Sequence, residues 1–161
     1  LIVIVAFAVL FTQTLAAGKV GYINLERLVQ ESVMGKSARE AIEQLRKEKQ
    51  LLISQKQNKI NEIRINLEAN SDLLEDDEKK DSVDELNSLL KEYKRMVADA
   101  QEEITKEDRE MVADILQEAD SVLKKVAQKK GYTIILKDPD SIGYLDESVD
   151  ITDAVIEELN K

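Results

Sequence analysis

Apolar residues recur at helical spacing along most of the chain, from residue 36 to residue 130. This stretch contains neither Gly nor Pro, the two residues least favourable in a helix interior. Average globular helices have ~11–12 residues, so a stretch of this length defines an architecture by itself. Its one weak point is residues 70–77 (NSDLLEDD), because Asn, Ser and Asp favour turns and caps. The pattern predicts two long helices folded back on each other, with a tip near residues 70–76.

The second arm, about residues 76–130, has the more regular apolar stripe. The stripe is apolar except at Asp108, and its members are Leu86, Leu90, Tyr93, Val97, Ala100, Ile104, Asp108, Met111, Ile115, Ala119, Val122 and Val126. Its mean step of about 3.64 residues exceeds the 3.5 of a heptad coiled coil. We therefore expect a nearly straight helix that runs past its shorter partner. A partial second row, formed by Leu89, Met96, Leu116 and Leu123, widens the apolar face.

The first arm, about residues 36–69, has a thinner stripe. Its members are Ala38, Ile42, Leu45, Leu52, Ile60, Ile63 and Leu67. The spacing is helical only if Lys49 and Lys56 fill two of the contact positions. Lysine stems can cover apolar surface while the ammonium groups stay in water, so this is physically reasonable. Ile53 and Ile65 lie off the stripe.

Short elements flank the hairpin on its N-terminal side. Residues 19–24 (KVGYIN) have the β-branched and aromatic content of a strand. Leu25, Leu28 and Val29 then suggest one or two helical turns, which we expect Gly35 to end before the first arm begins at residue 36.

More short elements follow the hairpin. Lys129, Lys130 and Gly131 are typical of a helix end. Residues 132–136 (YTIIL) predict a strand, residues 138–141 (DPDS) a turn, and residues 142–145 (IGYL) a second, shorter strand. A last helix is expected through Leu159, with Asp150 and Asp153 resembling a capping box.

These elements together predict an α+β fold. A long antiparallel, coiled-coil-like hairpin (residues 36–130) stands on a small β-rich body made of residues 18–35 and 131–161. So small a core is marginal alone, and its short sheet leaves open edges. We therefore expect a homo-oligomer whose body strands join across subunits.

The first residues have the pattern of a secretory signal peptide. Residues 1–11 (LIVIVAFAVLF) are an unbroken apolar run, and residues 12–18 (TQTLAAG) supply small residues suited to a signal peptidase. We expect residues 1–17 to be removed, with cleavage after Ala16 or Ala17, or after Gly18. A retained anchor is an alternative, although a membrane span needs ~20 apolar residues. A buried core helix is a second alternative.

The amino-acid composition excludes several kinds of catalytic and binding site. The chain has no His and no Cys, so the commonest general base, metal ligand and thiol nucleophile are missing. Its net charge of −10 argues against nucleic acid as a partner. Residues 68–85, around the tip, hold nine acidic and two basic side chains. We interpret them as solvated surface that also favours the start of the second arm, since they lack the glycine and spacing of a calcium loop. No enzyme activity, metal or cofactor is predicted.

The candidate functional residues are apolar side chains beside the two stripes. They are Ile53, Ile65, Leu89 and Met96. One interpretation is a weak, distributed binding surface, in which flexible Met contacts adapt to many partners. The alternative is that these residues only widen the contact within the hairpin.

The ordered motifs resemble a known family over essentially the whole mature chain. They are residues 19–25 (KVGYINL), Gly35-Lys36 before a long helix, the hairpin, Gly131-Tyr132 with residues 134–136 (IIL), and residues 150–152 (DIT) before a short helix. In this order, and with an export signal, they resemble the Skp (OmpH-like) periplasmic chaperones.

The resemblance implies a homotrimer in which three helical arms enclose a cavity below a β-rich body. It also implies a periplasmic holdase that binds unfolded outer-membrane proteins without ATP. The residues expected in the trimeric body are Val20, Tyr22, Ile23, Tyr132, Ile134, Leu136, Tyr144 and Ile151. Some members are strongly basic, whereas this chain is acidic, so no lipopolysaccharide site is carried over. The alternative function is a structural or adaptor coiled coil of the cell envelope without unfolded clients.

Overall fold

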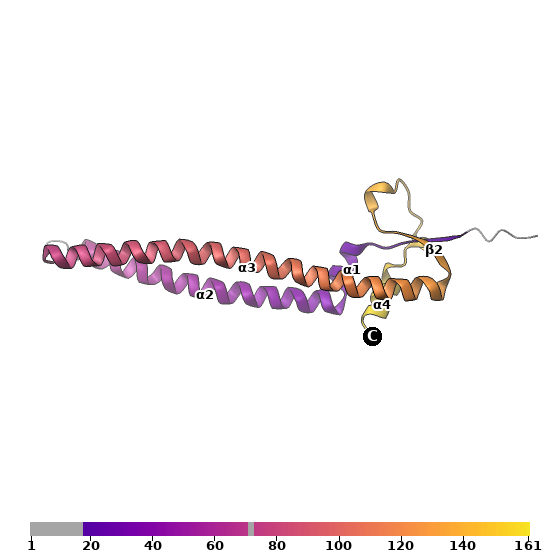
Figure 1. The fold of residues 1–161 in the computed structure, drawn as a ribbon, viewed down its shortest axis with the longest axis horizontal. Helices are drawn as coiled ribbons and strands as arrows, with labels where there is room; N and C mark the ends of the chain where they lie inside the picture. The colour runs from indigo at the N-terminus through magenta and orange to yellow at the C-terminus, as the bar shows by residue number, and fades with distance from the viewer. Residues whose placement is uncertain (1–17, 71–72) are drawn as a thin grey trace, which may run out of the picture.

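The protein is a long two-helix arm on a small base (Figure 1). The computed structural model describes residues 18–70 and 73–161. The predicted signal peptide, residues 1–17, lies outside the described residues, as do residues 71 and 72 of the tip. Within the described chain the α+β fold predicted from the sequence is confirmed, with a helical hairpin and a two-stranded sheet.

The arm consists of α2 (Val33–Ala69) and α3 (Asp76–Lys130), which run antiparallel. At 1.5 Å per residue, α3 is about 80 Å long, and it continues past the start of α2 into the base. Its first turn holds three acidic residues, and a reciprocal capping box joins Glu75 and Glu78. It ends at Gly131, which adopts φ 73°, a left-handed conformation that glycine reaches without a steric penalty. The predicted helical hairpin is confirmed; α2 ends at Ala69, and α3 runs from Asp76 to Lys130.

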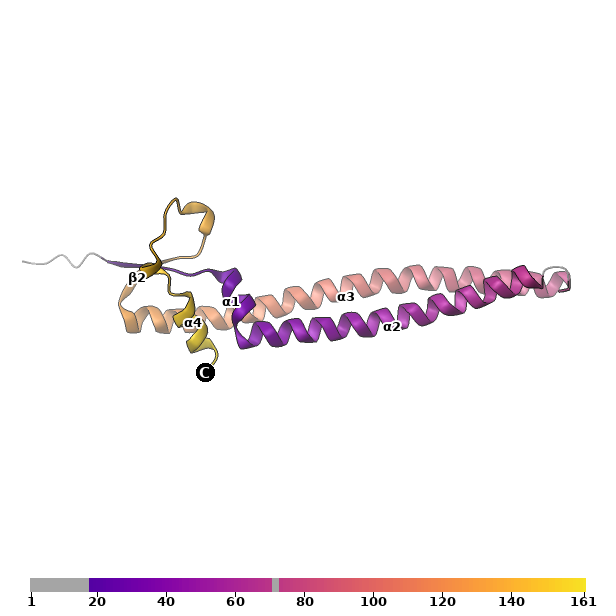
Figure 2. The same ribbon diagram turned by 180° about the vertical axis from the view of Figure 1, so that it is seen from behind.

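The line of contact between the helices changes along the arm. Near the tip the deepest residue of α3 is Leu89 from the second row, only 6% exposed, whereas Leu90 of the main stripe is half-buried. Seen from behind, α2 crosses α3 close to the tip (Figure 2). The second row therefore supplies part of the helix contact.

The prediction that Gly35 ends a helix is wrong. The helix α1 (Leu25–Glu31) ends at Ser32, and Gly35 lies in the first turn of α2, which starts at Val33 rather than at residue 36. The Ser32 hydroxyl caps α2 by accepting a hydrogen bond from the Gly35 N–H at 3.0 Å. A Cβ at position 35 would lie 1.6 Å from the Val29 carbonyl oxygen. The glycine thus allows two helices to meet closely at an elbow.

The base contains a parallel pair, β1 (Lys19–Tyr22) with β2 (Tyr132–Leu136). Val20 pairs with Ile134, and Tyr22 pairs with Leu136. The other edge of β1 forms a single bridge, in which the Ile151 N–H donates to the Tyr22 carbonyl at 2.8 Å. Among the described residues no further strand pairs with β2, so its outer edge is open.

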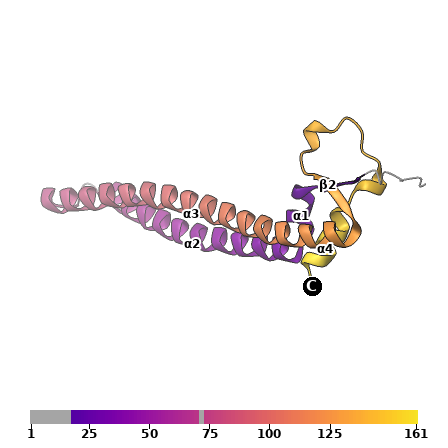
Figure 3. The same cartoon turned by 45° about the vertical axis from the view of Figure 1, so that its right-hand side comes forward.

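Two further expectations are corrected beyond β2. Residues 142–145 do not form a strand; they belong to an irregular loop between two 3-10 turns, η1 (Pro139–Ser141) and η2 (Glu147–Val149). This loop stands out from the base in Figure 3. The helix α4 (Thr152–Leu159) has no capping box, because Asp150 accepts from the Thr152 N–H while Asp153 pairs with Arg27.

The core lies where the chain ends meet α3. Its most deeply buried side chains include Ile23, Leu28 and Val155, each 0% exposed. The other members of the cluster are Ile115, Ala119, Val122, Leu123, Val126 and Ile151. The Thr152 hydroxyl accepts a hydrogen bond from the Asn24 N–H at 2.9 Å, and this bond links the start of α4 to the start of α1. The helix α3 therefore forms one wall of the core at its base end and one of the two helices of the arm along the rest of its length.

The elbow yields a first prediction. Gly35→Ala should lower the free energy of unfolding by about 3 kcal/mol, the upper end for overpacking, because the new methyl group meets backbone that cannot rotate away. Gly143→Ala is the matched control, since a Cβ there meets nothing within 4 Å. Urea unfolding followed by circular dichroism at one protein concentration measures both. Equal stability of the two variants would contradict the elbow's tight packing.

Candidate functional site

The polar side chains of the described residues do not form a recognisable metal site. In residues 18–70 and 73–161 no three acidic side chains converge to hold a metal ion. None of the helices in these ranges has an apolar stretch that could cross a membrane. The candidate sites are therefore exposed apolar surfaces, one on the base and two along the arm.

The surface on the base is one face of the sheet, formed by Val20, Ile134 and Leu136. These side chains are 39%, 54% and 41% exposed. Their register places them on one side of the sheet, while Ile135 on the other side packs against the core. We call them the exposed sheet face. It adjoins the open edge of β2.

The remaining predicted body residues divide into two groups. Tyr22, Ile23 and Ile151 are buried by their own chain at 6%, 0% and 3% exposure. Tyr132 is half-buried, with the Lys19 ammonium 4.3 Å from its ring centre, a cation–π contact. Tyr144, by contrast, is 83% exposed on the loop between η1 and η2. The predicted body residues thus include both single-chain core and free surface.

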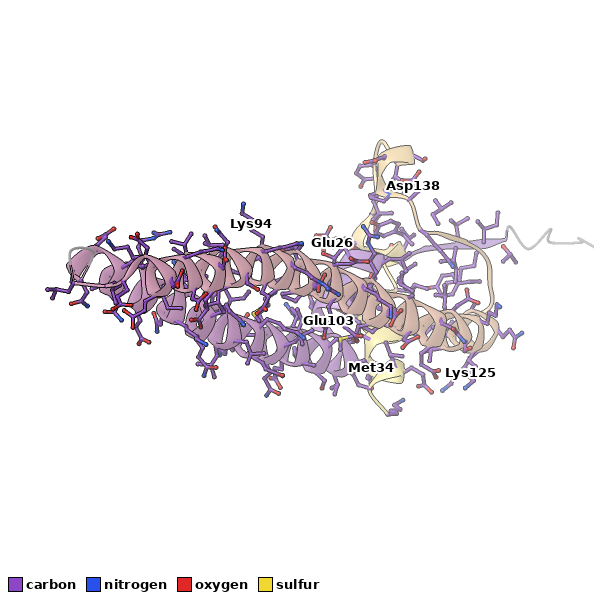
Figure 4. All side chains as sticks on the ribbon, turned by 60° about the vertical axis from the view of Figure 1, so that its left-hand side comes forward. Glu26, Met34, Lys94, Glu103, Lys125 and Asp138 are labelled. Atoms are coloured by element: carbon purple, nitrogen blue, oxygen red, sulfur yellow. The ribbon has the colours of Figure 1, made fainter. Side chains whose placement is uncertain are left out.

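Two aspartates shape the loop that carries Tyr144. Asp138, labelled in Figure 4, accepts from the Ser141 hydroxyl and from the Asp140 N–H. Asp146 accepts from the hydroxyl and the N–H of Ser148. The serine hydroxyls, followed by the backbone N–H groups, hold the pKa of both carboxyl groups below the usual range for Asp. These local turns order a loop that has few apolar contacts.

Two shallow grooves flank the helix contact in the middle of the arm. One is floored by Leu52, Met96 and Ala100. The other is floored by Ile53, Val97, Ala100 and Ile104. The predicted residues Ile53 and Met96 are half-buried and lie one in each groove. The helices therefore leave apolar side chains accessible on both sides of their contact.

The other two predicted contact residues differ in position. Ile65 is 64% exposed, away from the helix contact. Leu89 is only 6% exposed, so it cannot offer a free surface, and the alternative interpretation, that it widens the hairpin contact, describes it correctly. Leu89 is accordingly left out of the candidate surface.

Two further residues of the grooves are not among those predicted from the sequence. Leu52 is 43% and Val97 is 39% exposed, although both belong to the stripes that predict burial. Two antiparallel helices cover one line of residues, and the second row of α3 takes part of that line. The second apolar row of α3 is the feature of the sequence that could have indicated this, because two rows cannot both be fully covered by one partner helix.

Comparison with known proteins agrees with this architecture. The model of a family described as "Outer membrane protein (OmpH-like)" matches residues 19–159. The chain belongs to the OmpH-like (Skp) family. The predicted family is therefore confirmed, and it is a family of chaperones rather than of enzymes.

A solved structure supports the fold of this OmpH-like chain. It is described as a candidate outer membrane chaperone (OmpH-like) from Caulobacter crescentus. The likeness has a TM-score of 0.84 and covers 90% of this chain and 85% of that one, at 18% sequence identity. At this identity the comparison establishes the shared fold alone. A search of curated proteins finds no match.

The Asp138 turn gives a second prediction. Ser141→Ala should raise the pKa of Asp138 toward its ordinary value, because it removes the main hydrogen bond to the carboxylate. A lowered carboxyl pKa adds stability above the unfolded pKa, which is lost as pH falls through the folded pKa, so the turn should weaken below about pH 4. Carboxyl NMR titration measures the shift, with Asp146 as internal control. An unchanged Asp138 titration would contradict the assigned cause.

Proposed function

We propose that this OmpH-like protein is an ATP-independent periplasmic holdase that works as a homotrimer. Three arms enclose a cavity that holds unfolded outer-membrane proteins and prevents their aggregation. The observation that carries this proposal is the exposed sheet face beside an open strand edge, on a base that bears a long arm with accessible apolar grooves.

The base supports assembly because it is incomplete alone. A strand edge with unpaired N–H and C=O groups is a template for pairing, and apolar residues on a sheet face gain by burial. Val20, Ile134, Leu136 and Tyr144 are the residues we assign to contacts between subunits. Ile23, Tyr132 and Ile151 act indirectly, since they lie in or against the core of their own chain. Tyr22 pairs with Leu136 and is already buried within the single chain. Trimerisation also directs three arms to one side of the body.

The arms support client binding because their apolar residues are small in number and spread out. Ile53, Met96, Leu52 and Val97 lie in shallow grooves, and Ile65 stands alone. No single groove encloses a ligand, so each contact with a client is weak. Many weak contacts restrain an unfolded chain without fixing its conformation, which is what a holdase requires. The chemistry needs no nucleotide, metal or cofactor.

The proposed location follows from residues 1–17 and from the family. We propose that this segment is a signal peptide that is cleaved after export, which leaves the mature protein in the periplasm without stable membrane insertion. Its partners are then its own copies and unfolded outer-membrane proteins, with no role for nucleic acid.

Assembly is tested by mass. The mature chain should be a trimer by light scattering, and Ile134→Glu combined with Leu136→Glu should reduce it to single chains that keep their helical circular dichroism. The reason is that two carboxylates buried in the interface would lose their hydration. Leu51→Glu, on the 59% exposed outer surface of α2, should leave the trimer unchanged. A wild-type monomer or dimer, or a variant that stays trimeric, would refute the assembly.

Client binding is tested by aggregation of a denatured outer-membrane β-barrel protein after dilution. The wild-type trimer should suppress aggregation at one trimer per client. Replacing Ile53, Ile65 and Met96 together by Ser should weaken client retention by about tenfold, equivalent to about 1.4 kcal/mol spread over three contacts.

The matched variant is Leu89→Ser, which should lower arm stability instead, because Leu89 is buried. If the wild-type trimer gives no protection at all, the holdase proposal fails, and a structural or adaptor role of the coiled coil replaces it. If the triple variant protects as well as wild type, the client surface lies elsewhere.

A further inference from the structure

The middle of the arm is packed differently from its two ends. Along α2 the buried apolar residues are Ile42 toward the base and Ile60 toward the tip, with none between them. Along α3 only the small side chain of Ala100 is buried between Leu89 and Ile115. A methyl group contributes far less apolar area than the Leu or Ile side chains at the two ends.

Lysines occupy the contact positions that apolar residues leave empty. The side chains of Lys49 and Lys56 are only 22% and 23% exposed, which confirms that they lie in the helix contact. Their stems cover apolar surface, and their ammonium groups reach carboxylates of α3 at the rim. Figure 4 shows Glu103 on the side of α3 toward α2, whereas Lys94 projects away from the hairpin.

Three ion pairs cross from α2 to α3, and all have the lysine on α2. They are Lys49–Glu103 at 2.6 Å, Lys56–Glu92 at 2.8 Å and Lys59–Glu85 at 3.5 Å. No other ion pair joins the two helices in the described part of the chain. The carboxylates are about half exposed, so the pairs are hydrated, contribute little each and are screened by salt. The third pair lies beside the buried Ile60 and Leu89, so it belongs to the packed tip end. We call residues 45–56 and 92–104, which hold the other two pairs, the ionic section.

We propose that the ionic section is a compliant joint within the arm, where the two helices separate locally while both ends stay packed, with a stiffness set by ionic strength. The ends resist opening because it would expose Ile42, Ile60, Leu89 or the core. The middle opens more readily because its ammonium and carboxylate groups regain water when they part. The inference concerns the arm itself and does not depend on the holdase proposal.

Hydrogen exchange measured by mass spectrometry tests the joint in the full mature protein. Amides of the ionic section should exchange faster than those of residues 37–43 and 111–123. Raising sodium chloride from about 20 mM to 500 mM should speed exchange in the ionic section about two- to fivefold for each pair lost, and should leave the base end unchanged. Uniform exchange along the arm, or equal salt dependence everywhere, would overturn the proposal.

Substitutions distinguish the effect of the lysines in the helix contact from a general effect of replacing Lys by Leu in a helix. Lys49→Leu with Lys56→Leu should slow exchange in the ionic section and remove most of its salt dependence, because two apolar side chains replace two screened pairs. Lys47→Leu with Lys94→Leu is the matched control: it removes two lysines from exposed positions outside the helix contact. It should leave exchange in the ionic section unchanged, and equal slowing by both double variants would overturn the proposal.

A second variant covers the case in which the leucine protein aggregates. Glu92→Gln with Glu103→Gln removes the carboxylate partners and adds no apolar surface. At low salt its ionic section should already exchange at the rate that wild type reaches at high salt. If exchange instead stays at the low-salt wild-type rate, the ion pairs do not set the stiffness of the joint and the proposal fails.

Discussion

The packing of both chain ends against the base end of α3 is the contact on which the rest of the structure depends. Leu28 from α1 and Val155 from α4 are fully buried there together with Ile23 at the end of β1. Burying one such side chain contributes about 1.5–3 kcal/mol, so a few of them hold a base with little other core. Because the same helix continues as the arm, the direction of the arm and the position of the sheet are set together. The elbow at Gly35 then brings α2 back alongside α3.

The base and the arm use different kinds of surface. On the base, apolar residues on a sheet face lie beside an open strand edge, a combination that favours a second copy of the chain because both backbone and side chains gain partners. On the arm, apolar residues lie in shallow grooves with charged rims, where no backbone group is left unpaired. A partner held there gains only side-chain contacts. The first surface suits permanent assembly, and the second suits weak contacts with changing partners.

Charge has two roles along the arm. In the first turn of α3, carboxylates favour the positive end of the helix dipole and form a reciprocal cap. In the middle, carboxylates of α3 pair with lysines that stand in the helix contact. The acidic composition is therefore partly structural, since it specifies where the second helix begins and which side chains face each other across the hairpin.

The sequence by itself determined the elements whose signals are local. The helical period gave the hairpin, Asn70 and its neighbours gave the tip, Gly131 gave the end of α3, and the half-buried lysines followed from two gaps in a stripe. Tertiary contacts decided the rest. Gly35 has the appearance of a helix breaker in the sequence. In the structure the Val29 carbonyl lies so close that only a residue without a side chain fits at this position in the first turn of α2. Residues 142–145 have the composition of a strand, yet they lie in a loop that stands out from the base and does not pair with the open edge of β2, and β propensity alone does not form a strand. Leu89 of the second row is buried, whereas Val97 of the main stripe is exposed, the opposite of the expectation. The reason is that the sequence shows which residues share a helix face but not which line along that face the partner helix covers.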